Sequence, residues 1–325
     1  MSLKVLVTGG SGFIGSAVVK GLLKRGHSVR VLDDNSRGNP RRLVEVADDI
    51  EFMQGDVRDA DAVDRATAGV DAVAHLAFVN GTEFFYTKPK LVLEVGVKGA
   101  LNTLESAIKH NVPQYWLMSS SEVYQTPPMV PTDETVGFSI PDPLNPRYSY
   151  GGGKAISELM AINYGRGLFE KTIIVRPHNV FGPDMGWEHV VPQFVIRAEE
   201  AVKANPTGAV PFPIQGDGTQ MRSFVYIDDF VDGCLAAYLN GEGLNIYHVG
   251  TEDERSIADV ARTVVEFFGR EANVLPGALP QGGTNRRCPN IQKVRALGYD
   301  PKVSFLEGVN RTATWYIAHP ELRPA

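Results

Sequence analysis

The sequence predicts an α/β protein with a doubly wound parallel sheet and a smaller mixed α/β region that caps it. Strand-like runs alternate with helical patterns through the first half of the chain, which is typical of a parallel sheet covered on both faces. After Pro177 the chain becomes rich in Pro and Gly, from Gly182 to Gly218, and it ends in a helical pattern over residues 304–317. We therefore expect two parts that pack together, with no flexible linker between them.

The elements of the sheet follow from apolar patterns in chain order. We expect strands near Val5, Val29, Phe52, Val73, Trp116 and Ile174, with helices between them near Val18, Val63, Leu101 and Leu159. Right-handed crossovers then place the carboxyl ends of the strands, and any ligand, along one edge of the sheet. Ser256 and Asp259 precede a later apolar helical run and predict a capping box. Asp228 and Asp229 precede another, either as its N-cap or as a functional pair.

Composition limits the class of protein and its partners. The chain has 325 residues, 43% of them apolar, enough for a large core in one domain or two closely joined ones. A formal charge of -6, with no basic run longer than Arg41 and Arg42, argues against nucleic acid and membrane as partners. Cys234 and Cys288 form no disulfide framework or zinc-like spacing, so we expect no metal. We find no signal peptide or membrane-spanning run, and expect a cytoplasmic protein.

The most informative stretch is Lys4 to Gly15, KVLVTGGSGFIG, where a β-branched strand runs into glycines and then into an amphipathic helix. Gly9 allows the tight turn, Gly12 lets the backbone approach a pyrophosphate, and Gly15 lets the helix pack on the strand. The next strand ends in Asp33, near the spacing at which a carboxylate accepts the ribose hydroxyls. Together these features predict a Rossmann-type dinucleotide site, whereas the glycines alone would also suit a plain structural turn.

Two candidate catalytic side chains occur further along the chain. Tyr150 and Lys154 are four residues apart at the start of a helical pattern, so they share a face. A phenol is a weak base at neutral pH, but a neighbouring ammonium, helped by a positively charged nicotinamide, stabilises the phenolate, and we expect Lys154 to act on Tyr150 in this way. Hydroxyls and a carboxylate in Ser119 to Glu122, at the end of the preceding strand, are placed to face the phenol. A solvated helix face is the alternative that the spacing alone leaves open.

With these residues in place, the chain resembles the extended short-chain dehydrogenase/reductase family, specifically the NAD-dependent sugar-nucleotide epimerases and dehydratases, over essentially its whole length. The matching motifs are TGGSGFIG from Thr8, LDD from Leu32, GDVRD from Gly55, HLA from His75, SSSEVY from Ser119, YGGGK from Tyr150, RPHNVFGP from Arg176 and RSFVYIDD from Arg222. The resemblance implies Tyr150 as catalytic base, Lys154 as its partner and a ribose ligand, and Ser120 as the hydroxyl that shares the substrate proton. It also implies NAD as cofactor and a nucleotide sugar as substrate.

The binding residues that we expect divide into two sets. For NAD they are Gly9, Gly12, Phe13, Ile14, Gly15, Asp33, Asn35, Ser36, Asp56, Val57, Leu76, Ala77, Tyr150, Lys154 and Pro177. For the nucleotide sugar they are Ser120, Ser121, Asn179, His189, Val190, Arg222, Arg287 and Asn290. The resemblance implies adenine contacts at Asp56 and Val57, and diphosphate and nucleotide contacts at Asn179, Arg222 and Arg287. The Asp33 carboxylate favours NAD over NADP, because a 2′-phosphate would meet like charge.

The chain departs from the family pattern at three points and also carries an unusual run of three glycines. Gly96 stands where relatives usually carry Asn in an NxxG motif, so a hydrogen-bonding group is missing. Ser121 replaces the Asp that serves as acid in sugar dehydratases, and the pair Ser121 and Glu122 resembles that of glucuronate decarboxylases and some epimerases. Gln125 replaces a frequent glycine. Gly151 to Gly153 are unfavourable in a helix by up to about 1 kcal/mol each, and we expect their bare backbone to admit substrate or a partner helix.

We therefore expect an NAD-dependent nucleotide-sugar 4-epimerase that works through a transient 4-keto sugar, with Ser120, Tyr150, Lys154 and Glu122 as catalytic residues. The alternatives are a nucleotide-glucuronate decarboxylase or a 4,6-dehydratase that uses Glu122, and an NAD-binding sensor or scaffold. We expect an NAD-binding domain of residues 1–176 plus roughly 222–250, and a substrate-binding capping region of residues 177–221 and 251–325. Helices near Leu101 and Leu159 suit a four-helix contact in a homodimer.

Overall fold

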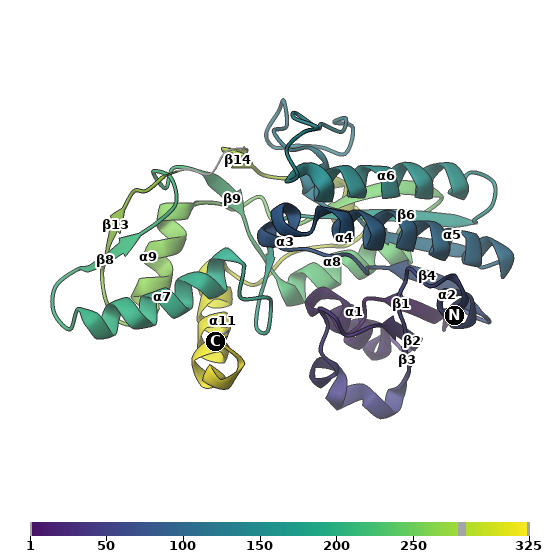
Figure 1. The fold of residues 1–325 in the computed structure, drawn as a ribbon, viewed down its shortest axis with the longest axis horizontal. Coiled ribbons are helices and arrows are strands. Elements are labelled where there is room, and N and C mark those ends of the chain that lie inside the picture. The colour runs from purple at the N-terminus through teal and green to yellow at the C-terminus, as the bar shows by residue number, and fades with distance from the viewer. Residues whose placement is uncertain (1, 279–283, 324–325) are drawn as a thin grey trace.

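The computed structural model describes residues 2–278 and 284–323 and has a central sheet of seven parallel strands (Figure 1). The strands lie in the order β11-β6-β5-β4-β1-β2-β3. Their bounds are β1 (Lys4–Thr8), β2 (Ser28–Asp33), β3 (Ile50–Gln54), β4 (Ala72–His75), β5 (Gln114–Met118), β6 (Lys171–Pro177) and β11 (Leu244–Val249). The order reverses between β1 and β4, and open α/β sheets bind ligands in the crevice beyond the carboxyl ends of strands at such a point.

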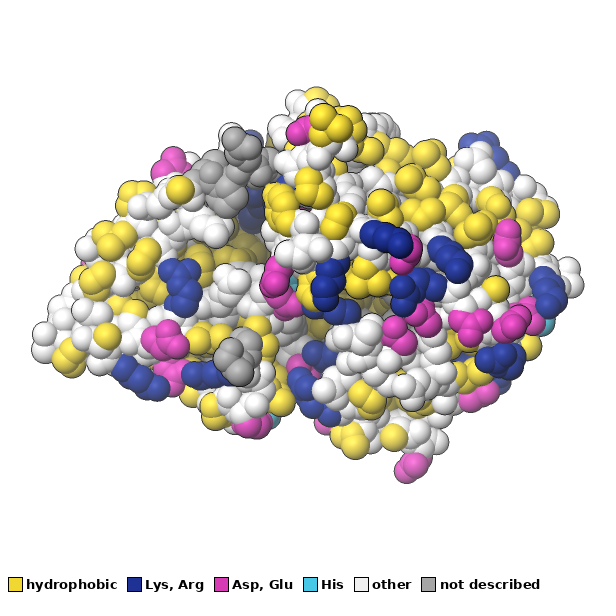
Figure 2. Space-filling view, in the orientation of Figure 1, with side chains coloured by type: hydrophobic (Ala, Val, Ile, Leu, Met, Phe, Trp, Pro, Cys, Tyr) yellow, Lys and Arg dark blue, Asp and Glu magenta, His cyan; other side chains and the backbone are white. Residues whose placement is uncertain are grey.

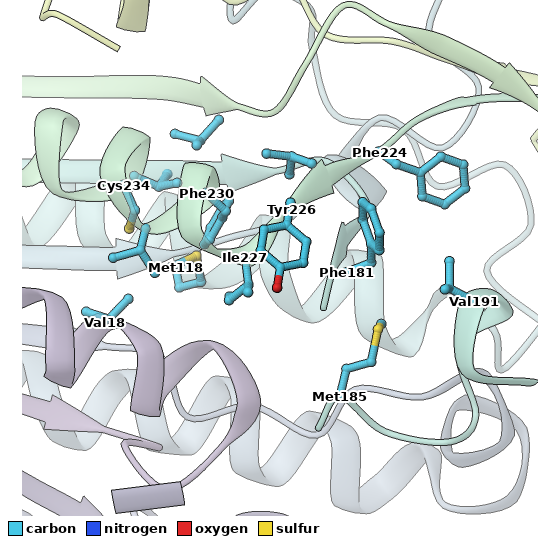
Figure 3. Close-up of a cluster of buried hydrophobic side chains, with 14 of the residues drawn as sticks. Val18, Met118, Phe181, Met185, Val191, Phe224, Tyr226, Ile227, Phe230 and Cys234 are labelled. Carbon is cyan, nitrogen blue, oxygen red and sulfur yellow. The ribbon is translucent and has the colours of Figure 1, made fainter. Parts of the chain in front are cut away.

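Helices cover both faces of the sheet because its strands alternate apolar side chains between two cores. In β1, Val5 and Val7 belong to the cluster with α1 (Phe13–Lys24) and α8 (Ile227–Asn240), whereas Leu6 belongs to a second cluster. The second cluster includes side chains of α2 (Ala60–Thr67), α5 (Gly99–Lys109) and α6 (Tyr148–Gly165). Figure 3 shows part of the first, where Val18 of α1, Met118 of β5 and Phe230 of α8 lie together. The predicted doubly wound parallel sheet is confirmed.

A smaller mixed α/β part lies beyond the carboxyl edge of the sheet (Figure 1). Its strands are β8 (Val210–Pro213) paired with β13 (Ala272–Leu275), and β9 (Met221–Ser223) between β12 (Glu254–Ser256) and β14 (Arg286–Arg287). The short strands β7 (Val180–Phe181) and β10 (Val225–Tyr226) form another pair, and the helices are α7 (Val190–Ala204), α9 (Ile257–Phe267) and α11 (Phe305–Ala318). The expected terminal helix is confirmed as α11, which Ser304 caps.

Two expectations for helix starts have opposite outcomes. The capping box is confirmed, because Ser256 Oγ accepts from Asp259 N (3.0 Å) and donates to the Asp259 carboxylate (2.7 Å). The N-cap alternative for Asp228 and Asp229 is wrong, because α8 already begins after Tyr226 and both aspartates lie in its first turn. Asp229 instead accepts from two backbone N–H groups just before α11, at 2.8 and 3.0 Å. It therefore ties the sheet helix α8 to the capping part.

The remaining helical segments are short. They are η1 (Pro40–Asp49), α3 (Thr82–Thr87), α4 (Pro89–Leu93), the π-helical turn η2 (Glu94–Lys98), η3 (Ser121–Val123), α10 (Gln292–Arg295) and η4 (Pro320–Leu322). Strand β11 comes from the segment 222–250 and pairs with β6. We retain as a proposal the division into 1–176 plus roughly 222–250, and 177–221 plus 251–325. Across residues 2–278 and 284–323, none of the helices combines the length and apolar character needed to traverse a bilayer.

Candidate active site

A cavity of about 990 Å³ lies at the carboxyl edge of the sheet and is lined by both parts of the chain. Figure 2 shows a hollow between the two parts, with Lys and Arg side chains (dark blue) at its margin. The residues expected at NAD that line the cavity are Gly9, Gly12, Phe13, Ile14, Gly15, Asp33, Ser36, Asp56, Val57, Leu76, Ala77, Tyr150, Lys154 and Pro177. Those expected at the sugar nucleotide are Ser120, Ser121, Asn179, His189 and Arg287, together with Glu122. The fold thus gathers most of both sets at one edge.

Four expected residues lie outside the wall of this cavity, and their side chains are engaged elsewhere. Asn35 accepts a hydrogen bond from a serine hydroxyl of the glycine-rich loop (2.9 Å). Arg222 donates to main-chain carbonyls of its own strand and of the segment before β14. Asn290 accepts from the backbone N–H two residues later (2.9 Å), and Val190 begins α7 and packs on the large core. Their roles at a ligand stay predictions.

The glycine-rich turn between β1 and α1 has the shape that a dinucleotide requires. Gly9 has φ +73°, a conformation that favours glycine. A Cβ at Gly15 would overlap the carbonyl oxygen of Gly9, so only glycine lets the helix approach the turn this closely. Gly12 is the N-cap of α1 and no side chain caps that end, so the N–H groups of the first turn are available to a phosphate. These residues fit the pyrophosphate of a bound dinucleotide.

Asp33 stands at the end of β2 with its carboxylate held in place by the turn. One oxygen accepts from the Ser11 N–H and the other from the Asn35 N–H, both at 2.9 Å. A carboxylate has about four acceptor positions, so two remain for ribose hydroxyls. Further along the cavity, Arg58 binds the carboxylate of Asp56, and the hydrogen bond from this guanidinium lowers the pKa of Asp56. The Asp33 and Asp56 carboxylates thus both line the cavity where we expect the nucleoside end of the cofactor.

The candidate catalytic side chains meet where β5 ends and α6 begins. Ser120 follows β5, and its Oγ accepts from the Glu122 N–H (3.1 Å), which fixes the hydroxyl at the start of η3. Lys154 Nζ donates to the carbonyl oxygen of Met118 (2.6 Å). Tyr150, one helical turn earlier, is buried and lies close enough to Ser120 for that hydroxyl to stabilise its phenolate. A strand end and a helix start thus hold the three groups together.

Burial shifts the pKa values of both members of this pair. Burial raises the pKa of Tyr150 above its ordinary value, and the Ser120 hydroxyl, which lowers it, does not offset this. Burial lowers the pKa of Lys154 to about 7. Both shifts have the same cause, because a charge on either buried group loses its hydration. The expectation that Lys154 and a positively charged nicotinamide together stabilise the Tyr150 phenolate concerns the cofactor-loaded site and stays a prediction.

Glu122 forms an ion pair with a residue far away in the chain. Arg287 Nη1 donates to Glu122 Oε1 at 2.7 Å, across 165 positions of sequence. Burial by itself raises the pKa of Glu122, but the charges of Arg287, Arg147 and Arg222 outweigh it and lower the pKa below its ordinary value. Glu122 is therefore ionised at neutral pH and has no proton to donate. The neighbouring Ser121 is buried and offers only a hydroxyl.

Gln125, a departure from the family pattern, and Gly151 of the glycine run fit each other in space. Gln125 replaces a frequent glycine but keeps a positive φ of 52°, and its Nε2 donates to the Glu122 carbonyl oxygen (2.5 Å). A Cβ at Gly151 would overlap this Nε2 and lie 2.7 Å from the same carbonyl oxygen. Gly151 thus makes room for Gln125. The expectation that its bare backbone admits substrate or a partner helix is wrong.

The other two glycines of the α6 run differ from each other. A Cβ at Gly153 would lie 3.2 Å from the Phe78 ring, so this glycine also accommodates a side chain of the same chain, and the expectation is wrong there too. At Gly152 the nearest atom, a carbon of Ile140, would lie 3.4 Å away, which is an ordinary contact. For Gly152 the approach of substrate or a partner helix stays a prediction.

Several residues that line the cavity escaped the sequence reasoning, and Phe78, Phe85 and Arg147 are among them. The rings follow the end of β4, one of the two strands at the reversal of strand order, and aromatic residues in that segment are a signal that could have placed them. Arg147 precedes Tyr150 by three positions, the spacing at which helical neighbours share a face. In residues 2–278 and 284–323, no group of His, Cys, Asp and Glu is placed to hold a metal ion.

Similarity to known proteins agrees with this geometry. The sequence model of the NAD dependent epimerase/dehydratase family matches residues 5–250 of the chain. The chain belongs to this family. Membership makes it an enzyme of an NAD-dependent family, and the glycine turn and Asp33 described above fit that cofactor.

Relatives within the family differ in the reaction that they catalyse. The crystal structure of the Thermus thermophilus UDP-glucose 4-epimerase in complex with NAD has a TM-score of 0.82 and 30% identity, over 97% of this chain and 99% of that one. UDP-glucuronic acid decarboxylase 1 of Arabidopsis thaliana is 31% identical over 312 residues, which cover 95% of this chain and 68% of the relative. A dTDP-glucose 4,6-dehydratase of Streptomyces antibioticus is 30% identical over 325 residues, 97% of this chain and 92% of the relative. Similarity therefore supports a nucleotide-sugar enzyme and leaves three reactions to distinguish.

Proposed function

We propose that this enzyme is a nucleotide-sugar 4-epimerase, which oxidises its substrate at C4 with NAD and returns the hydride to the opposite face of the ring. One observation carries the proposal. Ser120, Tyr150 and Lys154 line the cavity together, while a serine, Ser121, stands where a dehydratase needs its acid. A 4-keto sugar held here meets a base and hydroxyls but no adjacent acid able to expel a ring substituent. Return of the hydride is then the favoured outcome.

Each residue has one task in this proposal. Tyr150 takes the proton of the C4 hydroxyl and later gives it back, and the Ser120 hydroxyl holds the same oxygen. When bound, NAD supplies the hydride acceptor for C4 and a positive charge near the phenol. Lys154, fixed on Met118 O, holds the ribose beside the phenol, and Asp33 holds the ribose at the other end. Because burial raises the pKa of Tyr150, we expect phenolate to form only in the cofactor-loaded site.

Dehydration is disfavoured by the state of the acidic residue. Loss of a C6 hydroxyl needs a proton donor next to the catalytic serine. Glu122 cannot donate, because its ion pair with Arg287 keeps it ionised at neutral pH. Ser121 has no acidic proton to supply. The chain thus lacks a donor at both positions beyond Ser120.

Decarboxylation of a nucleotide glucuronate is the second candidate. The pair Ser121 and Glu122 and the similarity to a UDP-glucuronic acid decarboxylase favour it. After oxidation at C4 the C6 carboxylate is β to a ketone, so the C5–C6 bond can break with its electrons flowing into that ketone and a proton arriving at C5. Arg287 and Arg147, which both line the cavity, would attract the carboxylate.

Heavy water separates the candidates. Purified, NAD-loaded enzyme is incubated in D₂O with UDP- and dTDP-linked hexoses and with UDP-glucuronate, and the products are examined by NMR. Epimerisation gives a C4 epimer without deuterium on carbon, whereas decarboxylation of the uronate leaves deuterium at C5. Tyr150→Phe should abolish turnover in either case. Labelled pentose would replace the epimerase proposal with the second candidate, and no turnover of any compound would favour an NAD-binding sensor.

We also propose that the enzyme is a homodimer in the cytoplasm. Leu93, Ile156 and Leu159 keep 38–48% of their surface exposed, and the last two lie on α6. Figure 2 shows hydrophobic side chains across this side of the molecule. Ile156→Glu combined with Leu159→Glu should then halve the mass measured by light scattering. The two cysteines are free and buried, which suits a reducing compartment.

A further inference from the structure

The space beside Gly96, which has no side chain, is filled by the ring of Phe78. A Cβ at Gly96, in the π-helical turn η2, would overlap the ring of Phe78. Gly153 of α6 borders the same ring, 3.2 Å from where its own Cβ would lie. The two glycines therefore form a slot, and the tip of the Phe78 ring fills it. An asparagine at position 96 could not fit beside this ring.

The rest of the Phe78 ring contacts both members of the candidate catalytic pair. Lys154 Nζ lies 4.0 Å from the centroid of the ring, a distance typical of a cation–π contact. The Tyr150 ring meets it edge to face, with centroids 5.1 Å apart and planes at 83°. On its other side Tyr150 stacks on Phe85, with centroids 4.8 Å apart. Phe78 touches both groups, whereas Phe85 is stacked on the tyrosine.

We propose that Phe78 is a positioning residue of the Tyr150 and Lys154 pair. The ring, seated between Gly96 and Gly153, holds the ammonium on its face and the phenol at its edge. This proposal rests on the proposed function in one respect, since it assigns the pair to oxidation at C4.

Other groups around Lys154 Nζ also affect the pKa of this lysine. The Met118 carbonyl oxygen accepts a hydrogen bond from Nζ (N···O 2.6 Å), and the charge of the Glu158 carboxylate, on the same helix, raises the pKa of Lys154. His75, at the end of β4, is close enough for the lysine charge to lower its pKa, and its Nδ1 already bonds Thr8 Oγ1 (2.8 Å). Burial nevertheless lowers the pKa of Lys154 to about 7. Removing the aromatic face withdraws one stabiliser of the ammonium, so that pKa should fall further.

Phe78→Leu and Phe85→Leu form a matched pair for the test. Each removes one ring that contacts Tyr150, but only the first removes the face under Lys154. The full-length protein is labelled with ¹⁵Nζ-lysine, the Lys154 resonance is assigned by its loss in Lys154→Met, and its pH titration is followed. We expect the Lys154 pKa to fall in Phe78→Leu and to stay in place in Phe85→Leu. We expect kcat of Phe78→Leu to fall by about 2- to 30-fold, with the alkaline limb of its pH profile at lower pH.

A double-mutant comparison tests the same packing if one of the leucine variants folds poorly. Gly96→Asn alone should destabilise the protein, because its side chain overlaps the ring, whereas Phe78→Ala combined with Gly96→Asn should tolerate the amide. An unchanged Lys154 titration in Phe78→Leu, or an equal shift in Phe85→Leu, would overturn the proposal. Failure of the proposed function shows separately, as a native enzyme without turnover whose lysine titration still responds to Phe78→Leu.

Discussion

Two neighbouring glycines of α6 allow a matched test of packing beside the candidate base. Gly151 and Gly152 are both buried within the first turns of the helix. A Cβ at position 151 would overlap Gln125 Nε2 and lie 2.7 Å from a backbone oxygen, whereas a Cβ at position 152 finds its nearest atom at 3.4 Å. Alanine is favoured over glycine in a helix by up to about 1 kcal/mol, and overpacking costs about 1–3 kcal/mol. Gly152→Ala should therefore raise the free energy of unfolding, and Gly151→Ala should be less stable than that variant by about 1–3 kcal/mol.

Thermal unfolding of the two variants measures this difference. At roughly 2 °C per kcal/mol for a long chain, their melting temperatures should differ by about 2–6 °C. Gln125→Gly should recover part of the loss in Gly151→Ala, because it removes one of the two obstacles and suits the positive φ of that position. Equal stability of the two alanine variants would refute the packing argument. A Gly152→Ala protein that is stable but loses substrate affinity or dimer would support the approach of substrate or a partner helix there.

Three further predictions concern other polar contacts. Arg287→Met should lower the free energy of unfolding by about 3 kcal/mol or more, because it leaves the Glu122 carboxylate without its partner. Burial then raises the pKa of Glu122, so the variant should gain stability as the pH falls from 7 to 5. Urea unfolding that shows no such gain would contradict this. Asp33→Ser should move the ratio of NADP to NAD affinity toward NADP, measured by calorimetry, and an unchanged ratio would remove the carboxylate from the ribose site. Asp229→Ala leaves two backbone N–H groups before α11 without their acceptor, so hydrogen exchange at the start of that helix should accelerate, and unaltered exchange would show that the tie is not needed.

Much of the nucleotide-binding half could be predicted because its signals are local. The spacing of Gly9, Gly12 and Gly15 already specifies a tight turn and a close helix, and the structure places all three at the cavity. Alternating apolar residues predict strands with two buried faces, as Val5 and Leu6 illustrate. The position of Asp33 at the end of β2 could likewise be predicted from the apolar run that precedes it.

Residues that depend on distant partners could not be placed in this way. Arg287 meets Glu122 across 165 positions, and the sequence holds no sign that the two charges neutralise each other. Arg222 matched a family motif, yet its guanidinium is bound by main-chain carbonyls, which only the course of the segment before β14 brings near. The pKa of Tyr150 likewise depends on burial behind Phe85, a residue that no motif contains.

The sequence by itself determined the sheet, the glycine turn and the order of the motifs, because helix and strand periods and glycine requirements act between residues close in the chain. Only the tertiary structure decided what fills the space around the candidate base. In the sequence Gly96 is a lost amide, whereas in the fold it is room for Phe78, which comes from the end of another element. Such complementarity arises from close packing between segments far apart in the chain, and no local pattern records it.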